Sequence, residues 1–159
     1  DGVYKLSAIR GEDDAWHYKL KLSEQMLKIS NPGILQVRRF LRQGEYVADA
    51  IYDLKHPIQG DCKMVDLLDS TKETILKAGM KYEDLLQPIF RKGECVYALP
   101  SLDQIRNRTF AQLACFPTGI KRFLNPHLYA VGMEEAIYKE KLRLIKEIRE
   151  LNRLGVMQE

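Results

Sequence analysis

The stretch that decides the fold is residues 34–52, ILQVRRFLRQGEYVADAIY. Two strand-like runs, Ile34–Phe40 and Tyr46–Tyr52, flank the polar segment Arg42–Gln43–Gly44–Glu45. Two such runs separated by a short glycine-containing segment are typical of a β-hairpin. The sequence therefore predicts an antiparallel pair of strands here.

Two further strands are predicted before the hairpin, over Val3–Arg10 and Trp16–Leu22. In the first, apolar and polar side chains alternate, which is the period of a strand with one buried face. The polar segment Gly11–Asp14 forms a turn between the two strands. Asn31–Pro32–Gly33 predicts another tight turn, because proline fixes φ and glycine tolerates a positive φ.

Short strands are also predicted after the hairpin, interrupted by the turn residues His56–Pro57 and Gln59–Gly60. Met64–Leu68 and Tyr82–Phe90 are the strand candidates, whereas Thr71–Lys77 fits either a strand or a short helix. The first part of the chain is therefore expected to form a mostly antiparallel β-sheet.

The hydrophobic period becomes helical after Pro100. Ser101 and Gln104 have the spacing of a capping box, in which each side chain accepts a hydrogen bond from the other residue's backbone N–H. This helix is expected to end at Pro117 and Gly119. Its apolar residues are Leu102, Ile105, Leu113 and Phe116.

A second helix is predicted over Met133–Leu154, with Glu134 and Glu135 at its positive N-terminal end and Gly155 as its stop. Its apolar stripe consists of Ile137, Leu144, Ile148 and Leu151. The predicted fold class is α+β, with a mostly antiparallel β-sheet in the first part and two C-terminal helices.

The composition fits one ordinary globular domain, with 159 residues, 45% hydrophobic and 30% charged. A net charge of +3 gives only weak support for an anionic partner. Cys62, Cys95 and Cys115 are widely spaced and odd in number, which favours reduced cytoplasmic thiols over a disulfide framework or a zinc site. We expect no membrane span and no secretory leader, and we expect that processing or a chosen boundary set the start at Asp1.

The sequence contains no nucleophile elbow, zinc-protease motif, Walker loop or dinucleotide fingerprint. His17, His56 and His127 lie far apart in the sequence, and ordinary structural roles explain each of them. We therefore expect no catalytic residue and no metal ligand in this chain.

Lysines on the first strands are the most suggestive feature. Lys5 lies on the polar face of the first predicted strand, and Lys28 lies just before the Asn31–Gly33 turn, with Lys19 and Lys21 between them. Such lysines could form an edge that faces phosphate. A solvated sheet face also explains them, and from the chemistry alone it is the favoured interpretation.

A second basic cluster consists of Arg38, Arg39 and Arg42. On an alternating strand Arg38 and Arg39 face opposite sides. One of the two is expected to pair with a carboxylate.

Several ordered segments together resemble the C-terminal part of the nicotinate phosphoribosyltransferase family. The resemblance covers essentially the whole chain, and a set of motifs at family-like spacing is more specific than any single motif. The segments are Gly2–Leu6, Lys21–Glu24, Lys28–Gly33 with Arg38, Asp49–Ile51, Leu99–Leu102 with Ile105–Arg106, and Leu124–His127 with Tyr129 and Val131.

The resemblance implies an enzyme of NAD salvage. It joins nicotinate to phosphoribosyl diphosphate with ATP hydrolysis, uses Mg²⁺, and carries its catalytic centre on a barrel-like α/β domain upstream. Residues 1–55 would end the catalytic core and form the hairpin region, and residues 56–159 would form a C-terminal α+β domain. The segment alone would be inactive and would hold no cofactor.

The resemblance also implies that Lys5, next Lys28 and then Lys21 face the substrate phosphates. The parent enzyme would be a cytoplasmic homodimer whose upstream barrel is the partner of this segment, with no nucleic-acid or membrane partner.

Two alternatives stay open. One is a free-standing module that binds a nucleotide or RNA through the lysine-bearing sheet. It would need aromatic residues interleaved with basic ones, and only Trp16 and Tyr18 share a strand face. The other is an oligomerisation domain that uses the Met133–Leu154 helix as its contact.

Overall fold

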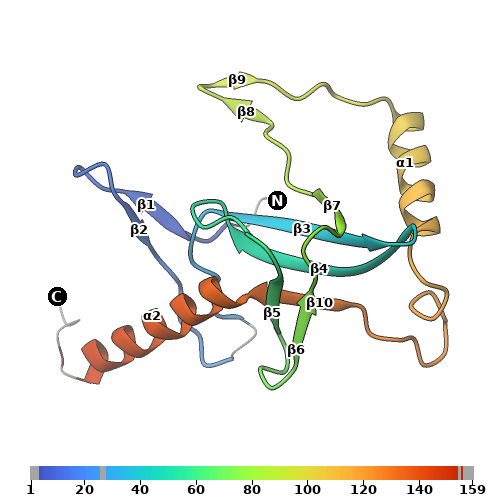
Figure 1. The fold of residues 1–159 in the computed structure, drawn as a ribbon. Coiled ribbons are helices and arrows are strands. Elements are labelled where there is room, and N and C mark those ends of the chain that lie inside the picture. The colour runs from blue at the N-terminus through green and yellow to red at the C-terminus, as the bar shows by residue number, and fades with distance from the viewer. Residues whose placement is uncertain (1–3, 26–27, 154, 156–159) are drawn as a thin grey trace.

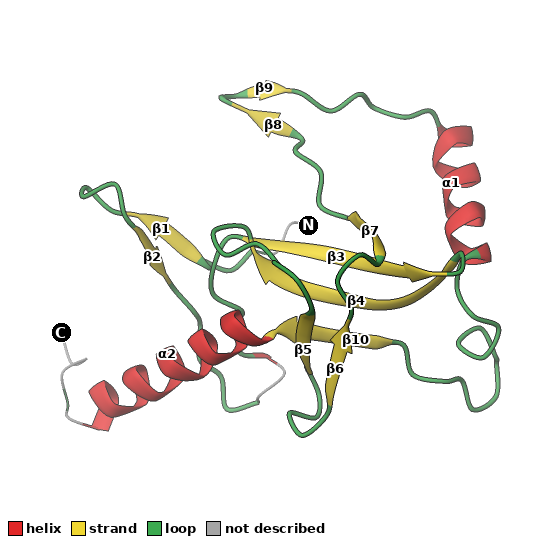
Figure 2. Cartoon of the chain, in the orientation of Figure 1, coloured by secondary structure: helices red, strands yellow, loops and turns green. Residues whose placement is uncertain are grey.

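The structure is a computed structural model that describes residues 4–25, 28–153 and 155. Ten strands and two helices occur in these ranges (Figures 1 and 2). They are β1 (Ala8–Arg10), β2 (Trp16–Tyr18), β3 (Leu35–Arg42), β4 (Glu45–Asp53), β5 (Cys62–Asp66), β6 (Glu73–Leu76), β7 (Lys81–Asp84), β8 (Phe90–Arg91), β9 (Glu94–Cys95), α1 (Leu102–Ala114), β10 (Ala130–Glu134) and α2 (Glu135–Arg153).

A six-stranded sheet in the order β6-β5-β10-β4-β3-β7 forms the centre of the fold. All its neighbouring strands are antiparallel except β10 and β4, which are parallel. The predicted α+β class is therefore confirmed. The predicted boundary between residues 55 and 56 stays a prediction, and strands from both sides of it pair in this sheet.

The predicted hairpin is confirmed as β3 and β4, which pair from Leu35–Asp53 to Arg42–Glu45. Its turn contains two residues rather than four, Gln43 and Gly44, with φ values of 52° and 86°. Positive φ at both positions gives the turn the twist that matches two antiparallel strands, and glycine adopts it without steric cost.

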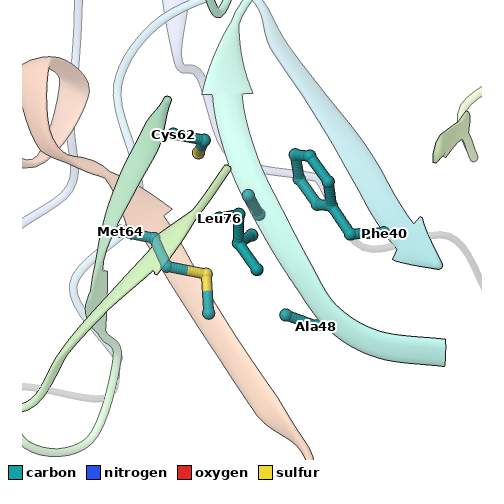
Figure 3. Close-up of a cluster of buried hydrophobic side chains, with 6 residues drawn as sticks. Phe40, Ala48, Cys62, Met64 and Leu76 are labelled. Carbon is teal, nitrogen blue, oxygen red and sulfur yellow. The ribbon is translucent and has the colours of Figure 1, made fainter. Parts of the chain in front are cut away.

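The hydrophobic core fills the concave side of the curled sheet. Figure 3 shows Phe40 from β3, Ala48 from β4, Cys62 and Met64 from β5, and Leu76 from β6 gathered in one cluster. Each of these side chains is at most 5% exposed. Burial raises the pKa of the Cys62 thiol to about 11, so it is a protonated, apolar core residue.

The second helix begins two residues later than predicted. Met133 and Glu134 belong to β10, where Met133 pairs with Ile51 of β4 and is fully buried. Pairing with strands distant in the sequence therefore overrides the helical pattern at this point. The Glu134 carboxylate accepts hydrogen bonds from the backbone N–H groups of Ala136 and Ile137, which caps α2.

Helix α2 buries Ile137 and Ile145; it contacts β5 and β10 where it begins and then runs away from the sheet (Figure 1). Of the predicted stripe, Leu144 and Ile148 are half-buried and Leu151 is 43% exposed, while Leu154 lies outside the described residues. Among the described helices, none is long and apolar enough to cross a membrane.

The first two predicted strands are shorter than expected. β1 pairs with β2 only from Ala8–Tyr18 to Arg10–Trp16. Residues before Ala8 contact the chain differently, because the Ser7 carbonyl accepts hydrogen bonds from both Lys19 N–H and Gly33 N–H, each at 2.9 Å. Val3, the first residue of the first predicted strand, lies outside the described residues.

The remaining strand predictions are partly corrected. The open segment Thr71–Lys77 contains strand β6, and the predicted strand Tyr82–Phe90 is divided between β7 and β8. The chain leaves the sheet after β7, where the Gln36 side chain, rather than a backbone strand, hydrogen-bonds the backbone of Leu86. Its amide donates to the Leu86 carbonyl and accepts from the Leu86 N–H, at 3.0 and 2.9 Å.

Residues 86–128, which we call the arm, extend away from the sheet and contain β8, β9 and α1 (Figure 1). The predicted capping box is confirmed, with Ser101 N–H donating to Gln104 Oε1 and Gln104 N–H donating to Ser101 Oγ. The helix ends at Ala114, before Pro117. None of its thirteen residues is buried.

Two phenylalanines test which part of the chain forms the core. Phe40 is 4% exposed and Phe110 of α1 is 58% exposed. Phe40→Ala should lower the free energy of unfolding of the 159-residue chain by about 3–5 kcal/mol, through lost burial and the cavity left behind. Phe110→Ala should change it by less than about 0.5 kcal/mol. Urea denaturation measures both, and equal effects would contradict the assignment of the core.

Candidate functional site

The structure brings the three lysine-bearing segments together at one edge of the fold. Lys5, Lys21 and Lys28 are all exposed. The Lys5 ammonium donates to the Lys28 carbonyl at 3.2 Å. Ser30 N–H donates to the Lys21 carbonyl, and Lys21 N–H donates to Ser30 Oγ at 2.7 Å. Three segments that lie apart in the sequence therefore lie side by side, while the role of their lysines toward phosphate stays a prediction.

The Asn31–Gly33 turn fixes this edge against α2. Asn31 Oδ1 accepts from the Lys141 ammonium at 2.8 Å, and burial lowers the pKa of Lys141. Gly33 has a φ of +101°, and a Cβ at this position would lie 3.2 Å from Ile137 and 3.4 Å from Asp53. Glycine is required here by both backbone conformation and space.

Asp53 is the buried carboxylate that joins these segments, and sequence reasoning missed it. Only 2% of its side chain is exposed. Its Oδ1 accepts from the backbone N–H groups of Ile34 and Lys55, at 3.2 and 3.1 Å. Its Oδ2 accepts from the Tyr18 hydroxyl and lies 3.2 Å from His56 Nδ1. An Asp at the end of a strand, directly before a Pro-containing turn, was the available signal.

The surroundings of Asp53 favour its charged form. Burial alone would raise the pKa of Asp53, but hydrogen bonds from Tyr18, Lys55, His56 and Ile34 outweigh it, so the pKa is lowered. Burial and the nearby Asp53 carboxylate raise the pKa of Tyr18. Asp53 is therefore ionised and Tyr18 is protonated at neutral pH, and both act structurally.

The arginine prediction is corrected, because both Arg38 and Arg39 pair with carboxylates. Arg38 binds Asp84 through two hydrogen bonds of 2.8 and 3.0 Å, and Arg39 binds Asp49 through two of 2.9 and 2.8 Å. Each acid lies directly opposite its arginine on the neighbouring strand. Register across the sheet decides these pairs, so a single-strand pattern could not show them.

Aromatic rings enclose both guanidinium groups. Arg38 lies over Tyr82 and Tyr52, with centroid distances of 3.7 and 4.9 Å. Arg39 lies over Tyr46 and Phe116, at 4.8 and 5.2 Å. Hydrogen bonding to Asp49 raises the pKa of Arg39. Arg38 and Arg39 therefore serve to hold the sheet together. Arg42 of the same cluster is exposed at the end of β3.

A cavity of about 810 Å³ lies between the β1–β2 hairpin, the turn after β4 and α2. Its lining includes Trp16, Tyr18, Lys19, Lys55 and Arg143. Lys55 lies 5.9 Å from the Trp16 ring centroid, the Tyr18 hydroxyl is held by Asp53, and Arg143 pairs with two glutamates of α2. Four of these five groups, all but Lys19, thus have side-chain contacts within the chain, which gives little support to a base-stacking nucleotide module.

The histidines do not converge in the structure. His17 Nε2 lies 3.4 Å from Asp13, His56 contacts Asp53, and His127 N–H donates to the Gly119 carbonyl. Within the ranges that the structure describes, no three His, Cys, Asp or Glu side chains are grouped to hold a metal ion.

Asp53 should control the acid stability of the domain. Its folded pKa lies below the unfolded value of about 3.9, so its stabilising contribution is present above that pH and is lost as the pH falls through the folded pKa. Asp53→Asn should lower the free energy of unfolding by about 1–3 kcal/mol at pH 7 and flatten its decline below pH 4.

The control is Asp14→Asn, because Asp14 is 75% exposed in its ion pair with Arg10. It should change stability by less than about 1 kcal/mol. Denaturation curves from pH 2 to 8 measure the free energy of unfolding of both variants. If that free energy still falls steeply below pH 4 in Asp53→Asn, Asp53 does not control the acid stability.

Comparison with known proteins places these features in a family. The family described as nicotinate phosphoribosyltransferase C-terminal domain matches residues 34–141. A Bacillus subtilis (strain 168) nicotinate phosphoribosyltransferase is 27% identical over 150 residues, which covers 92% of this chain and 30% of the relative. One from Dictyostelium discoideum is 25% identical over 146 residues, covering 86% and 24%. This chain thus spans less than a third of the length of these relatives.

A crystal structure of human nicotinic acid phosphoribosyltransferase shares the fold, with a TM-score of 0.65 and 20% identity over 82% of this chain and 27% of that one. The family match covers well over half of the 159 residues, and it includes the central hairpin, the arm and the beginning of α2. The chain therefore belongs to the nicotinate phosphoribosyltransferase C-terminal domain family.

Proposed function

We propose that this chain is the C-terminal domain of a nicotinate phosphoribosyltransferase. The longer enzyme joins nicotinate to phosphoribosyl diphosphate with ATP hydrolysis and yields nicotinate mononucleotide for NAD synthesis. The observation that carries the proposal is the family match over residues 34–141, together with relatives of that name that are more than three times as long. This domain is mainly structural and does not turn over substrate alone.

Within that enzyme, Lys5, Lys28 and Lys21 face the substrate phosphates. In the reaction negative charge gathers on the leaving diphosphate, so fixed cations near it lower the barrier. The contact between Lys5 and the Lys28 carbonyl supports a shared edge, and the Gly33–Asp53 packing holds that edge in place. Lys5 is the first choice because it matches the family's pattern best, and its ammonium contacts the Lys28 segment.

Mg²⁺ and ATP are held by the upstream part of the enzyme. The described acids nearest the domain's centre are already committed, Asp49 and Asp84 to arginines and Asp53 to four donors. These three carboxylates are therefore engaged by contacts within the domain rather than open to a magnesium ion. We place the enzyme in the cytoplasm as a homodimer, with no nucleic-acid or membrane partner for this domain.

Replacing Lys5 tests the proposed site. In the longer enzyme, Lys5→Ala should raise the KM for phosphoribosyl diphosphate or lower kcat, with kcat/KM falling about tenfold, the size of one charged hydrogen bond of roughly 1.5 kcal/mol. Steady-state kinetics with varied phosphoribosyl diphosphate measure this effect.

The matched control is Lys146→Ala on α2, whose side chain is 79% exposed. It should leave the kinetics unchanged. If Lys5→Ala, Lys28→Ala and Lys21→Ala all behave like this control, the lysines are only a solvated edge and the site assignment is wrong.

A further inference from the structure

The arm carries an extended apolar surface that its own domain leaves uncovered. Exposed apolar side chains occur on each of its parts. They include Phe90 on β8 (66%), Leu99 in the linker (84%), Leu102 and Phe110 on α1 (81% and 58%), and Phe123 and Leu128 in the return loop (98% and 89%). So many exposed large apolar side chains on one projecting element indicate an interaction site.

Both ends of the arm are firmly attached to the sheet. At the first end, the Gln36 side chain holds Leu86 through two hydrogen bonds. At the second, Tyr46 N–H donates to the Cys115 carbonyl, and the Phe116 ring packs edge-on against Tyr46 and Tyr129. The Tyr129 hydroxyl donates to Asp49 at 2.8 Å. The apolar side chains are therefore presented by an anchored element.

The charge of the arm argues against pairing with another arm. Residues 86–128 contain six Lys and Arg against two Asp and Glu, a net charge of +4, although the whole chain carries only +3. Two such arms packed on each other would repel, because like charges placed together at an interface are unfavourable. The fitting partner is an apolar surface with an acidic rim.

The size of the partner can also be inferred. The exposed residues lie on a strand pair, a linker, a helix and a loop. Figure 2 shows these elements following one another along the arm, so a single partner helix would leave most of the exposed residues uncovered. About 70% of the length of the Bacillus subtilis relative lies outside the aligned segment. Two surfaces on one polypeptide meet at a high effective concentration, which makes contact within the chain favourable.

We infer that the arm docks onto an apolar, acid-rimmed surface of the polypeptide that precedes residue 1 in the same molecule of the longer enzyme. This inference rests on the proposed function, since it requires the upstream part to exist. It assigns residues 86–128 to holding the catalytic part and this domain together.

Photo-crosslinking in the longer enzyme tests the inference. A benzophenone amino acid replaces Phe110 on α1, or Lys146 on α2 as the control site. Unlabelled and heavy-isotope copies are mixed before irradiation, and crosslinked peptides are identified by mass spectrometry. The Phe110 site should crosslink to upstream peptides of the same isotope label, at least several-fold more than the Lys146 site.

Crosslinks from Phe110 that join light to heavy copies as often as they join copies of the same label would overturn the inference in favour of a contact between subunits. Crosslinks no more frequent than those from Lys146 would overturn it as well. Phosphoribosyltransferase activity is measured on the unsubstituted enzyme, so an inactive enzyme contradicts the proposed function separately from the docking result.

Discussion

The buried Asp53 carboxylate is the interaction on which the arrangement of the N-terminal third depends. A carboxylate in the interior is tolerated only when hydrogen bonds replace its lost hydration. Lys55 and His56 supply two of these contacts from the turn that follows Asp53, while Tyr18 and Ile34 supply the others from two more distant segments, so these segments must be in place together. Gly33 allows the turn to approach Asp53 closely, and the lysine edge is thereby fixed beside the sheet.

Two cross-strand pairs of an arginine and an aspartate likewise join separate segments to the sheet. Arg38 ties the edge strand β7 to β3 through Asp84, and Arg39 ties Asp49 to the ring of Phe116, where the arm returns. The sheet therefore carries two separate features, the lysine edge and the apolar arm. Such a division suits a domain that positions parts of a larger enzyme.

Much of the fold was predictable because its signals are local. The β3–β4 hairpin, the Asn31–Gly33 turn and the Ser101–Gln104 capping box each depend on a few neighbouring residues. Features that depend on pairing between distant strands could not be predicted. Met133 lies in a strand because β4 and β5 flank it, and Arg38 lies opposite Asp84 only because of the register of β7. Asp53 was missed partly for the same reason, since its donors Tyr18 and Ile34 lie 35 and 19 residues away in the sequence. The exposure of α1 could not be foreseen either, because its apolar residues have the spacing of an ordinary core helix.

The central claim is that these residues are one domain of a longer enzyme rather than a functional unit. The most direct measurement is the mass of the full-length polypeptide in a cell extract, read from a denaturing gel with an antibody raised against this segment. We expect a single band at about three times 18.4 kDa, since the segment aligns with 30% of the Bacillus subtilis relative. A band at 18.4 kDa alone would contradict it and would favour an independent binding module.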